Sequence, residues 1–347
     1  MDNRAFICGL EGLALTQGER DFISRYKPWG GILFARNIDS PDQIRSLCQS
    51  FRECLDDAGA PIFIDQEGGR VQRIKPPIVQ AYPPGSVYGE IYRQDAFAGA
   101  EAVHLGAKLI GLDLMNFGIT GNCIPLLDMP VEDSDPVIGD RAYGRDIETI
   151  ATLGTAAIGG LASAGVLPVM KHLPGHGRAC VDSHKQLPVV DCDLDVLDAA
   201  DFVPFRLNAA RAPLAMSAHI IFCAVDEENP ATLSPAVIDN IIRGRIGYSG
   251  ALMTDDISMG ALSGSLGERT SRALQAGCDL VLHCNGVLEE MIEVAENSPV
   301  LDGDPLIRTE SALAWRENKA RQAETADMKA LSARFDALVS KYGAVHV

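Results

Sequence analysis

The sequence has few of the features that mark disordered, fibrous or multidomain proteins. Its 347 residues contain no low-complexity tract, no internal repeat and no recognisable linker. Because 47% of the residues are hydrophobic and 22% are charged, the chain can bury a sizeable core, which excludes a disordered or collagen-like protein. We therefore expect one domain that spans residues 1–347.

Positive charge is scarce in this chain. There are 30 Lys and Arg residues against 47 Asp and Glu residues, which gives a formal net charge of −17 at pH 7. A surface with this excess of acid repels a nucleic-acid backbone and an anionic lipid leaflet alike. The charge balance therefore predicts no nucleic-acid partner and no membrane partner.

Paired cysteine motifs are also absent. The nine cysteines are an odd number, and no two of them form a C-x-x-C motif, so we expect reduced thiols, as in a cytoplasmic protein. The first residues, MDNRAFICGLEG, contain no apolar run of the length found in secretory signal peptides. Both observations predict a cytoplasmic location.

One uncharged run, residues 149–170, is long enough to cross a bilayer. It contains several glycines and Pro168, with Thr and Ser residues between them. This composition favours a small-residue helix packed on a sheet, followed by a buried strand, over a membrane span.

Short apolar runs alternate with helical patterns along the chain, a rhythm typical of a parallel sheet with crossover helices. Seven runs predict strands, and the eighth strand of a barrel stays unassigned. The runs are GGILFARN from Gly30, PIFIDQEG from Pro61, LDLMNF from Leu112, GVLPVMKH from Gly165, PLAMSAHIIF from Pro213, GALMTDDIS from Gly250 and CDLVLHCN from Cys278.

Helix starts can be recognised between these runs. Residues 40–43, Ser-Pro-Asp-Gln, supply an N-cap, a proline at the first helical position and a capping-box glutamine. Residues 234–235, Ser-Pro, open a second helix. From residue 309 onward the chain is rich in Ala, Glu, Lys and Arg, so we expect a C-terminal helical segment, 309–347, packed on the domain.

Polar side chains follow most of the predicted strands. In a (β/α)8 barrel the carboxyl ends of the strands form the active-site rim, so such groups converge there from distant positions. This pattern predicts an α/β fold, a (β/α)8 barrel of the TIM type, rather than a doubly wound open sheet. The groups are Arg36-Asn37, Asp65-Gln66-Glu67, Asn116, Lys171-His172, His219, Asp255-Asp256 and His283 to Asn285.

The densest group of reactive side chains lies within residues 171–184, which contain three histidines, a lysine and an aspartate. Pro174, Gly175 and Gly177 interrupt any helix, so the segment is expected to be a loop on the rim that can fold over a pocket or move away. Such a cluster in a loop indicates a catalytic site.

A second candidate is the segment 253–259, where a strand runs directly into two carboxylates. An acid at the end of a barrel strand suits a nucleophile, but adjacent strand residues point to opposite sides, so only one of the pair is expected to face a substrate. Asp256 is expected to accept backbone N–H bonds as a helix cap. Segments 64–73 and 138–145 add carboxylates and guanidinium groups, which a polyhydroxylated ligand requires.

In this order the four segments resemble glycoside hydrolase family 3, and within it the single-domain β-N-acetylhexosaminidases. The most specific signature is KHLPGHG, followed after four residues by DSH. The resemblance extends from about Gly9 to Asn285, with Leu173 in place of a usual aromatic residue and Thr254 in place of a frequent serine. Supporting motifs are GGILFARN, IDQEGGRVQR, VIGDRAYGRD, PATLSP, MTDDISMGA and AGCDLVLHCN.

The resemblance implies a retaining exo-β-N-acetylglucosaminidase that works without a metal or other cofactor. Asp255 would be the nucleophile, and His184, held by Asp182, the general acid/base. Because His184 lies on a loop, it can sit away from Asp255 until substrate binds. The residues implied to hold the sugar are Asp65, Arg73, Arg141, Lys171 and His172, with His176 shaping the loop.

The same resemblance implies a small carbohydrate substrate. Members of this subgroup release N-acetylglucosamine from muropeptides that carry 1,6-anhydro-N-acetylmuramic acid, during cell-wall recycling in the cytoplasm. The sequence leaves the oligomeric state open, a monomer included.

Other functions remain open on the residues alone. A zinc-dependent hydrolase would take its ligands from His172, His176, Asp182 and His184, although proline and glycine break the helix that H-x-x-x-H zinc sites use. An aldolase would form a Schiff base on Lys171. An N-acetylglucosaminide phosphorylase on the same fold would use phosphate in place of water, and a sugar-binding protein would use neither.

Overall fold

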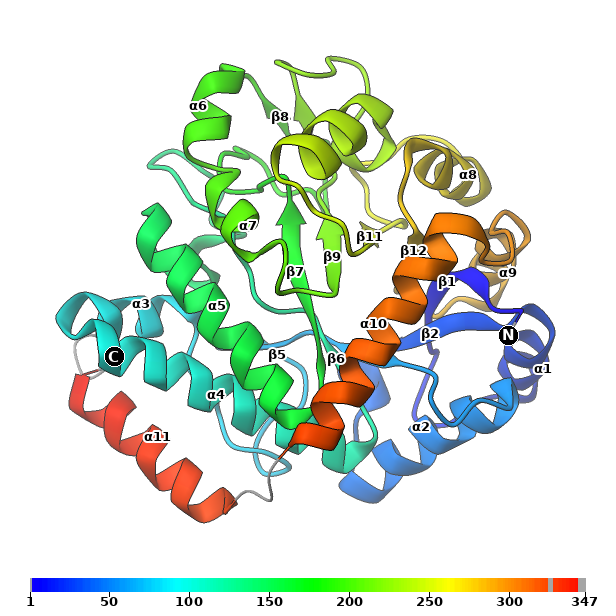
Figure 1. The fold of residues 1–347 in the computed structure, drawn as a ribbon. Helices are drawn as coiled ribbons and strands as arrows, with labels where there is room; N and C mark the ends of the chain where they lie inside the picture. The colour runs from blue at the N-terminus through cyan, green and yellow to red at the C-terminus, as the bar shows by residue number, and fades with distance from the viewer. Residues whose placement is uncertain (1, 324–326, 343–347) are drawn as a thin grey trace.

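Eight parallel strands close into a barrel in the computed structural model of the chain, which describes residues 2–323 and 327–342 (Figure 1). Successive barrel strands pair around the ring, and β1 pairs with β12 to close it. The predicted TIM-type (β/α)8 fold is therefore confirmed. The strands are β1 (Arg4–Gly9), β2 (Pro28–Leu33), β3 (Ile62–Ile64), β6 (Gly121–Asn122), β7 (Leu167–Leu173), β9 (Leu214–Ser217), β11 (Ala251–Asp256) and β12 (Leu280–His283).

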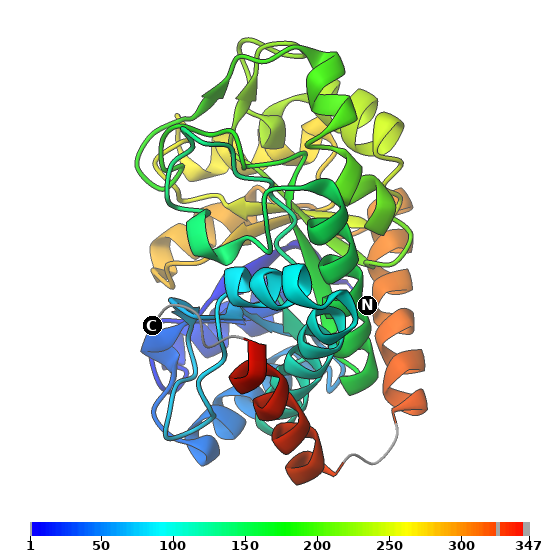
Figure 2. The same ribbon diagram turned by 90° about the vertical axis from the view of Figure 1, so that its left-hand side faces the viewer.

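Helices connect the strands and cover the outside of the barrel (Figures 1 and 2). They are α1 (Gln17–Tyr26), α2 (Pro41–Leu55), α3 (Gly85–Gln94), α4 (Ala96–Phe117), α5 (Ile147–Ala164), α6 (Leu194–Ala199), α7 (Val203–Asn208), a π-helix (Val237–Arg245), α8 (Leu266–Ala276), α9 (Leu288–Glu296), α10 (Gly303–Gln322) and α11 (Met328–Tyr342). Two small sheets lie outside the ring. They pair β4 (Gln66–Gly68) with β5 (Val71–Gln72), and β8 (Val189–Val190) with β10 (Ile221–Phe222).

The two helix starts read from the sequence are present. The Ser40 hydroxyl accepts the N–H of Gln43 at 3.4 Å, and the Gln43 side chain accepts the N–H of Asp39 rather than that of the cap residue. At the second start, the Ser234 hydroxyl accepts the N–H of Val237 at 3.2 Å. That helix continues with wide π-type turns.

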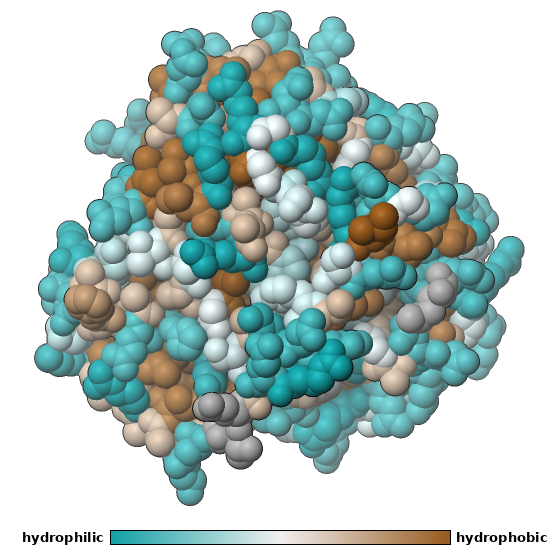
Figure 3. All heavy atoms as spheres, viewed as in Figure 1, coloured by the Kyte–Doolittle hydropathy of each residue, from teal (hydrophilic) through white to brown (hydrophobic). Residues whose placement is uncertain are grey.

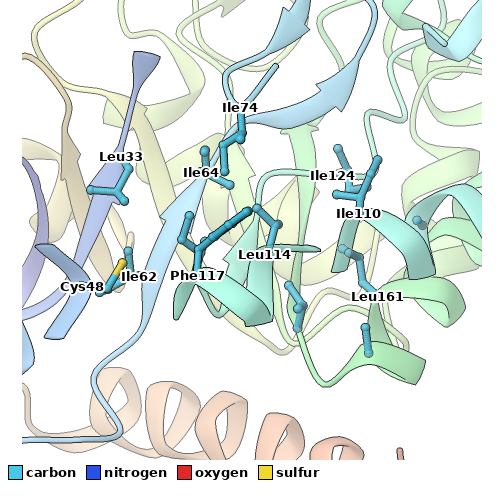
Figure 4. Close-up of a cluster of buried hydrophobic side chains, with 14 of the residues drawn as sticks. Leu33, Cys48, Ile62, Ile64, Ile74, Ile110, Leu114, Phe117, Ile124 and Leu161 are labelled. Carbon is cyan, nitrogen blue, oxygen red and sulfur yellow. The ribbon is translucent and has the colours of Figure 1, made fainter. Parts of the chain in front are cut away.

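The strand predicted from Leu112 is wrong, because this segment is the C-terminal end of α4. Its apolar residues are buried at helical rather than alternating spacing, and Figure 4 shows Leu114 and Phe117 on the helix beside Ile64 of β3. Asn116 is consequently an exposed helix residue and not part of the barrel rim.

The strand that replaces it, β6, has only two residues. A Cβ atom at Gly121 would lie 2.2 Å from the ring of Phe63, so only glycine fits there without displacing that ring. The strand left unassigned in the sequence is β1, a short run that begins only four residues into the chain.

The interior of the barrel is filled by side chains. The rings of Trp29 and Phe63 stack with centroids 5.9 Å apart, and aliphatic residues of the other strands pack around them. Helix α10 crosses the strands in Figure 1. Its residues Ala312 and Leu313 pack on this interior cluster. It lies beside Trp29 and Pro61, near the amino ends of β2 and β3, so that end of the barrel is closed.

The predicted C-terminal helical segment consists of two helices, and the first begins earlier than expected, at Gly303. The second, α11, lies against α4 (Figure 2), and its Phe335 packs near the rings of Tyr82 and Tyr88, with centroids 6.1 and 6.4 Å away. Residues 324–326 and 343–347 of the predicted segment lie outside the described residues. The assignment of the whole chain to a single domain stays a prediction.

Helix α5 coincides with most of the uncharged run, and by length and composition it could cross a membrane. In the structure 56% of its most apolar window is buried, and the helix packs against α4 and α7. Such burial against neighbouring helices is typical of a helix on the outside of a barrel. Figure 3 shows the face of Figure 1, where hydrophobic residues form separate patches among hydrophilic ones.

Candidate active site

A cavity of about 290 Å³ lies at the carboxyl ends of the barrel strands. The structure brings all but one of the predicted site residues to its wall, and the exception, Asp182, contacts one of them from outside the wall. The predicted residues that line the cavity are Asp65, Arg73, Arg141, Lys171, His172, His176, His184 and Asp255.

Lys171, at the end of β7, joins two acidic side chains that follow β3. Its Nζ lies 2.9 Å from Oδ1 of Asp65 and 2.7 Å from Oε1 of Glu67. Arg141 donates two hydrogen bonds to the same glutamate, at 2.8 and 2.9 Å. Arg73 lies 3.3 Å from Oδ2 of Asp65. We call these five side chains the charge cluster.

The charge cluster fixes the ionisation of its members. Burial alone would raise the pKa of Asp65 and of Glu67, but the positive charges of Lys171 and the neighbouring guanidinium groups outweigh this effect. The net result is a pKa of about 2 for Glu67 and a pKa below the ordinary range for Asp65. Burial lowers the pKa of Lys171, but the two carboxylates raise it above its usual value. Because a protonated amine is not a nucleophile, this geometry does not support a Schiff-base aldolase.

Two histidines share one buried carboxylate. Nδ1 of His172 lies 2.7 Å from Oδ2 of Asp128, and the backbone N–H of His176 donates to Oδ1 of the same residue at 2.7 Å. Burial raises the pKa of Asp128, but the His172 ring and these N–H bonds lower it below its ordinary value. Asp128 therefore holds both the end of β7 and the start of the loop that follows.

Asp255 lies at the carboxyl end of β11 and faces the cavity. Burial raises its pKa, but the neighbouring His172 and His219 rings and the backbone N–H of Asp256, at 2.8 Å, lower it below the ordinary value. The carboxylate is therefore ionised at neutral pH.

The neighbouring carboxylate, Asp256, accepts backbone N–H bonds as expected, but contrary to expectation it lines the cavity as well as Asp255. Asp256 accepts backbone N–H bonds from Ser258 and Cys284, both at 3.1 Å, and the Ser258 hydroxyl at 2.7 Å. A turn rather than a helix follows it. His219 lies beside this strand end with Nε2 at 3.0 Å from the Asp256 carbonyl oxygen, and it is fully buried.

The loop after β7 is attached to the neighbouring loop, residues 126–137. The carbonyl oxygens of Gly177 and Ala179 accept the N–H groups of Val131 and Asp135, at 3.2 and 2.8 Å. A Cβ atom on Gly177 would lie 2.0 Å from the carbonyl oxygen of Met129, so this close approach requires glycine.

Further along the same loop, His184 reaches the cavity. Its Nδ1 lies 2.8 Å from Oδ1 of Asp182, its side chain is 64% exposed, and its carbonyl oxygen accepts the N–H of Gly260 at 3.3 Å. The structure thus brings His184 and Asp255 to the wall of one cavity.

The geometry does not support a zinc site on this loop. One ring nitrogen of each histidine, His172, His176 and His184, is directed to a different partner, namely Asp128, Ser183 and Asp182. Within residues 2–323 and 327–342, no three His, Cys, Asp or Glu side chains are grouped so that they could hold a metal ion.

Three residues of the site were not assigned to it from the sequence. Glu67 was named in a strand-end group but given no role. No sequence pattern indicated Phe34, whose ring lies under the guanidinium groups of Arg73 and Arg36, at 5.5 and 5.0 Å. Asp128 is the only charged residue between Ile124 and Met129. A lone acid in an apolar run predicts a buried, paired carboxylate and would have identified it.

Comparison with known proteins agrees with this geometry. The model of the glycosyl hydrolase family 3 N terminal domain matches residues 10–302. The chain is 38% identical over 280 residues to a β-hexosaminidase of Alkalilimnicola ehrlichii, which covers 80% of this chain and 79% of the relative. It is 34% identical over 319 residues to a β-hexosaminidase of Methylococcus capsulatus, with 90% and 92% covered.

Solved structures give the same result. NagZ from Neisseria gonorrhoeae in complex with N-trifluoroacetyl-D-glucosamine superposes with a TM-score of 0.86 at 29% identity, over 97% of this chain and 98% of that one. A family 3 β-N-acetylglucosaminidase from a Paenibacillus species also gives 0.86, at 32% identity, over 97% of this chain and 67% of that one.

The barrel and its pocket of carboxylates, cations and histidines fit a glycoside hydrolase. The chain belongs to glycoside hydrolase family 3, as the sequence motifs had indicated. The curated relatives that it matches along most of their length are β-hexosaminidases, and the chain shares their enzyme class.

Proposed function

We propose that this enzyme is a retaining exo-β-N-acetylglucosaminidase in which Asp255 is the nucleophile and His184 is the general acid/base. The observation that carries the proposal is that these two groups, one from a strand and one from a loop, line the same small cavity as four members of the charge cluster, all but Glu67. Nucleophile, acid and sugar-binding groups are the three components that glycoside cleavage requires.

The proposed reaction has two displacements. In the first, a carboxylate oxygen of Asp255 bonds to the anomeric carbon while the bond to the glycosidic oxygen breaks, and that oxygen takes the proton of His184. In the second, the oxygen of a water molecule bonds to the same carbon, its proton passes to His184, and Asp255 is released. Two inversions retain the β configuration.

The environment of each group suits its role. Asp255 is held ionised, as a nucleophile must be. An imidazole can give and take a proton near neutral pH. The Asp182 carboxylate accepts a hydrogen bond from Nδ1 of His184, which orients the ring so that Nε2 can serve the leaving oxygen.

The charge cluster and His172 are proposed to bind the sugar. Hydroxyl groups both donate and accept, so a wall with carboxylates and cations in alternation can satisfy them. Nε of Arg73 is buried and has no acceptor in the described protein, and a sugar hydroxyl would supply one. The cavity of about 290 Å³ is of small-ligand size, which favours removal of one terminal sugar.

The natural substrate is the second part of the proposal. N-acetylglucosamine linked to 1,6-anhydro-N-acetylmuramic acid, in muropeptides recycled in the cytoplasm, fits the family resemblance. The similar NagZ structure holds N-trifluoroacetyl-D-glucosamine, a relative of the proposed sugar. All nine cysteines of this chain are free in the structure, which supports a reducing compartment.

The testing experiment measures p-nitrophenol release from p-nitrophenyl N-acetyl-β-D-glucosaminide by the wild type and by Asp255→Ala, with and without a chelator. Asp255→Ala is expected to lose at least about 10³-fold in kcat because no covalent intermediate can form. The chelator is expected to leave the rate of p-nitrophenol release unchanged for both proteins. Proton NMR of the first-formed sugar is expected to show the β anomer.

Each alternative has its own outcome in this assay. Activity that survives in Asp255→Ala would refute the proposed nucleophile, and activity lost to chelator would restore the zinc hydrolase. Repeating the assay in phosphate buffer separates water from phosphate as acceptor, because a phosphorylase would yield N-acetylglucosamine 1-phosphate. The muropeptide assignment requires release of N-acetylglucosamine from the anhydro-disaccharide.

A further inference from the structure

The loop between β7 and β8 has an anchored part and a part that carries the acid/base pair. Residues 174–179 are anchored by the backbone bonds to the 126–137 loop and by Arg178, whose Nε donates to the buried Asp201 at 2.7 Å. Residues 180–187 include Asp182 and His184. In the described structure only three hydrogen bonds join this second part to residues outside it.

Two of the three are weak constraints. One is the long bond from the N–H of Gly260 to the His184 carbonyl oxygen, at 3.3 Å, and another is the thiol of Cys180 at 3.6 Å from the Arg178 carbonyl oxygen. The third is the contact between Nε2 of His176 and the hydroxyl of Ser183, at 3.0 Å. It is the one side-chain bond that joins the two parts across buried space.

His176 is well placed to hold Ser183. The two residues are 4% and 2% exposed. The backbone of His176 is fixed by Asp128 at 2.7 Å, and its ring lies against that of His172, with centroids 5.6 Å apart. Burial lowers the pKa of His176 to about 4, so the ring is neutral near pH 7 and can share one proton with the hydroxyl.

We propose that His176 and Ser183 form a latch that positions the acid/base pair over the cavity. Ser183 lies between Asp182 and His184 in the chain, so holding its side chain fixes the backbone from which both groups project. The two latch residues are positioning residues, since neither is proposed to touch the reacting atoms. The inference rests on the proposed function, because it assumes that His184 delivers the proton.

The latch makes a prediction that a general structural role does not make. A p-nitrophenolate leaving group departs with little help from an acid, whereas the sugar alkoxide of a disaccharide needs a proton. Loss of a positioned acid therefore slows disaccharide cleavage more than aryl glycoside cleavage. Damage to the sugar site, the nucleophile or the fold slows both reactions by the same factor.

The experiment compares kcat/KM on p-nitrophenyl N-acetyl-β-D-glucosaminide and on the β-1,4-linked N-acetylglucosamine disaccharide. For Ser183→Ala we expect a loss of about tenfold or more on the disaccharide and below about threefold on the aryl substrate, a part of what a positioned acid supplies. Ser183→Thr keeps the hydroxyl and is expected to restore the wild-type ratio. His176→Gln, which keeps the backbone bond to Asp128, is expected to resemble Ser183→Ala.

A matched control removes a hydroxyl elsewhere. Ser163, on α5, donates to the Gly159 carbonyl oxygen at 2.8 Å, so Ser163→Ala should leave both rates unchanged. Equal losses on the two substrates in both Ser183→Ala and His176→Gln, or no loss in either, would overturn the latch. Thermal unfolding shows whether each variant has folded. If one of the two has not, the substrate comparison for the folded variant decides whether the latch exists.

His184→Ala separates this inference from the function on which it rests. If that variant shows the disaccharide-selective loss and the latch variants do not, the latch is wrong and the acid assignment stands. If His184→Ala shows no selectivity, the acid lies elsewhere and the proposed function fails in that part.

Discussion

At the scale of single residues, the charge cluster shows how one substitution changes both binding and stability. Lys171 is buried with two carboxylates around it, and Glu67 is in turn held by Arg141. A buried charge that loses its partner is far more costly than one that keeps it. The members of the cluster are therefore coupled, and removal of any one disturbs the others.

Glu67→Gln is expected to lower the free energy of unfolding at pH 7 by about 3 kcal/mol, since two buried cations lose a countercharge. The folded-state pKa of Glu67 is about 2 and its ordinary value 4.5. Because the pKa is depressed on folding, the carboxylate's contribution is complete above pH 4.5 and is lost as the pH falls toward 2.

Urea unfolding of the wild type and of Glu67→Gln at pH 7 and at pH 3 checks this prediction. The difference between the two proteins should be smaller at pH 3. A difference that is equal at both pH values would show that the glutamate stabilises the fold by its shape and not by its charge.

Single residues also show what sequence reasoning could reach in the site. Asp65, Lys171 and Asp255 were predicted because barrel topology sends the end of every strand to one rim. Their pairing was not predictable, because it depends on which strands are neighbours around the ring and on the depth of each side chain. The link between His176 and Ser183 depends on the path of the loop, which no periodic pattern encodes.

At the scale of elements, predictions succeeded where a strand or helix carries its own pattern. Six of the seven proposed strand runs overlap a barrel strand. The run from Leu112 is short and mostly apolar, but the longer helical pattern from residue 96 prevails because a helix of 22 residues buries far more apolar surface. Strand β6 is too short to show such a pattern, and it is fixed by the close packing of Gly121 on Phe63 and by two hydrogen bonds between the Asn122 side chain and the Gln66 backbone.

Gly121→Ala tests that reading of β6. The added methyl group would lie 2.2 Å from the Phe63 ring, so we expect the free energy of unfolding to fall by about 2 kcal/mol through overpacking. Gly12→Ala is the matched control, because nothing lies within 4 Å of its added Cβ atom, and it should change stability by less than about 0.5 kcal/mol. Chemical unfolding of both variants decides, and equal stabilities would contradict the packing argument.

At the scale of the whole molecule, the C-terminal helices pack away from the reactive groups. The carboxyl ends of the strands bear the reactive groups, and α10 and α11 cover the amino end and the outer helices. The sequence predicted helices at the end of the chain from composition alone. It could not predict their positions, because these are fixed by contacts with residues more than two hundred positions earlier.

Phe335→Ala uses this separation. Phe335 is buried between α11 and the rest of the molecule, and its loss is expected to lower the free energy of unfolding by about 3–5 kcal/mol. The kcat of the folded variant at 25 °C should equal that of the wild type, because α11 packs on α3 and α4, whose described residues do not line the cavity. Unfolding curves and steady-state kinetics on one preparation test both statements, and a lower kcat in fully folded protein would refute the separation.

The filled barrel interior also determines the route by which ligands enter and leave the cavity. Trp29 and Phe63 stack in the interior and α10 lies across the amino end, so the described residues leave the cavity no opening through that end of the barrel. Whatever part of a ligand goes in first must come out last, by the route that the next ligand needs. Bound product therefore occupies the space that the next substrate needs, so accumulated product is expected to slow turnover by competing with substrate.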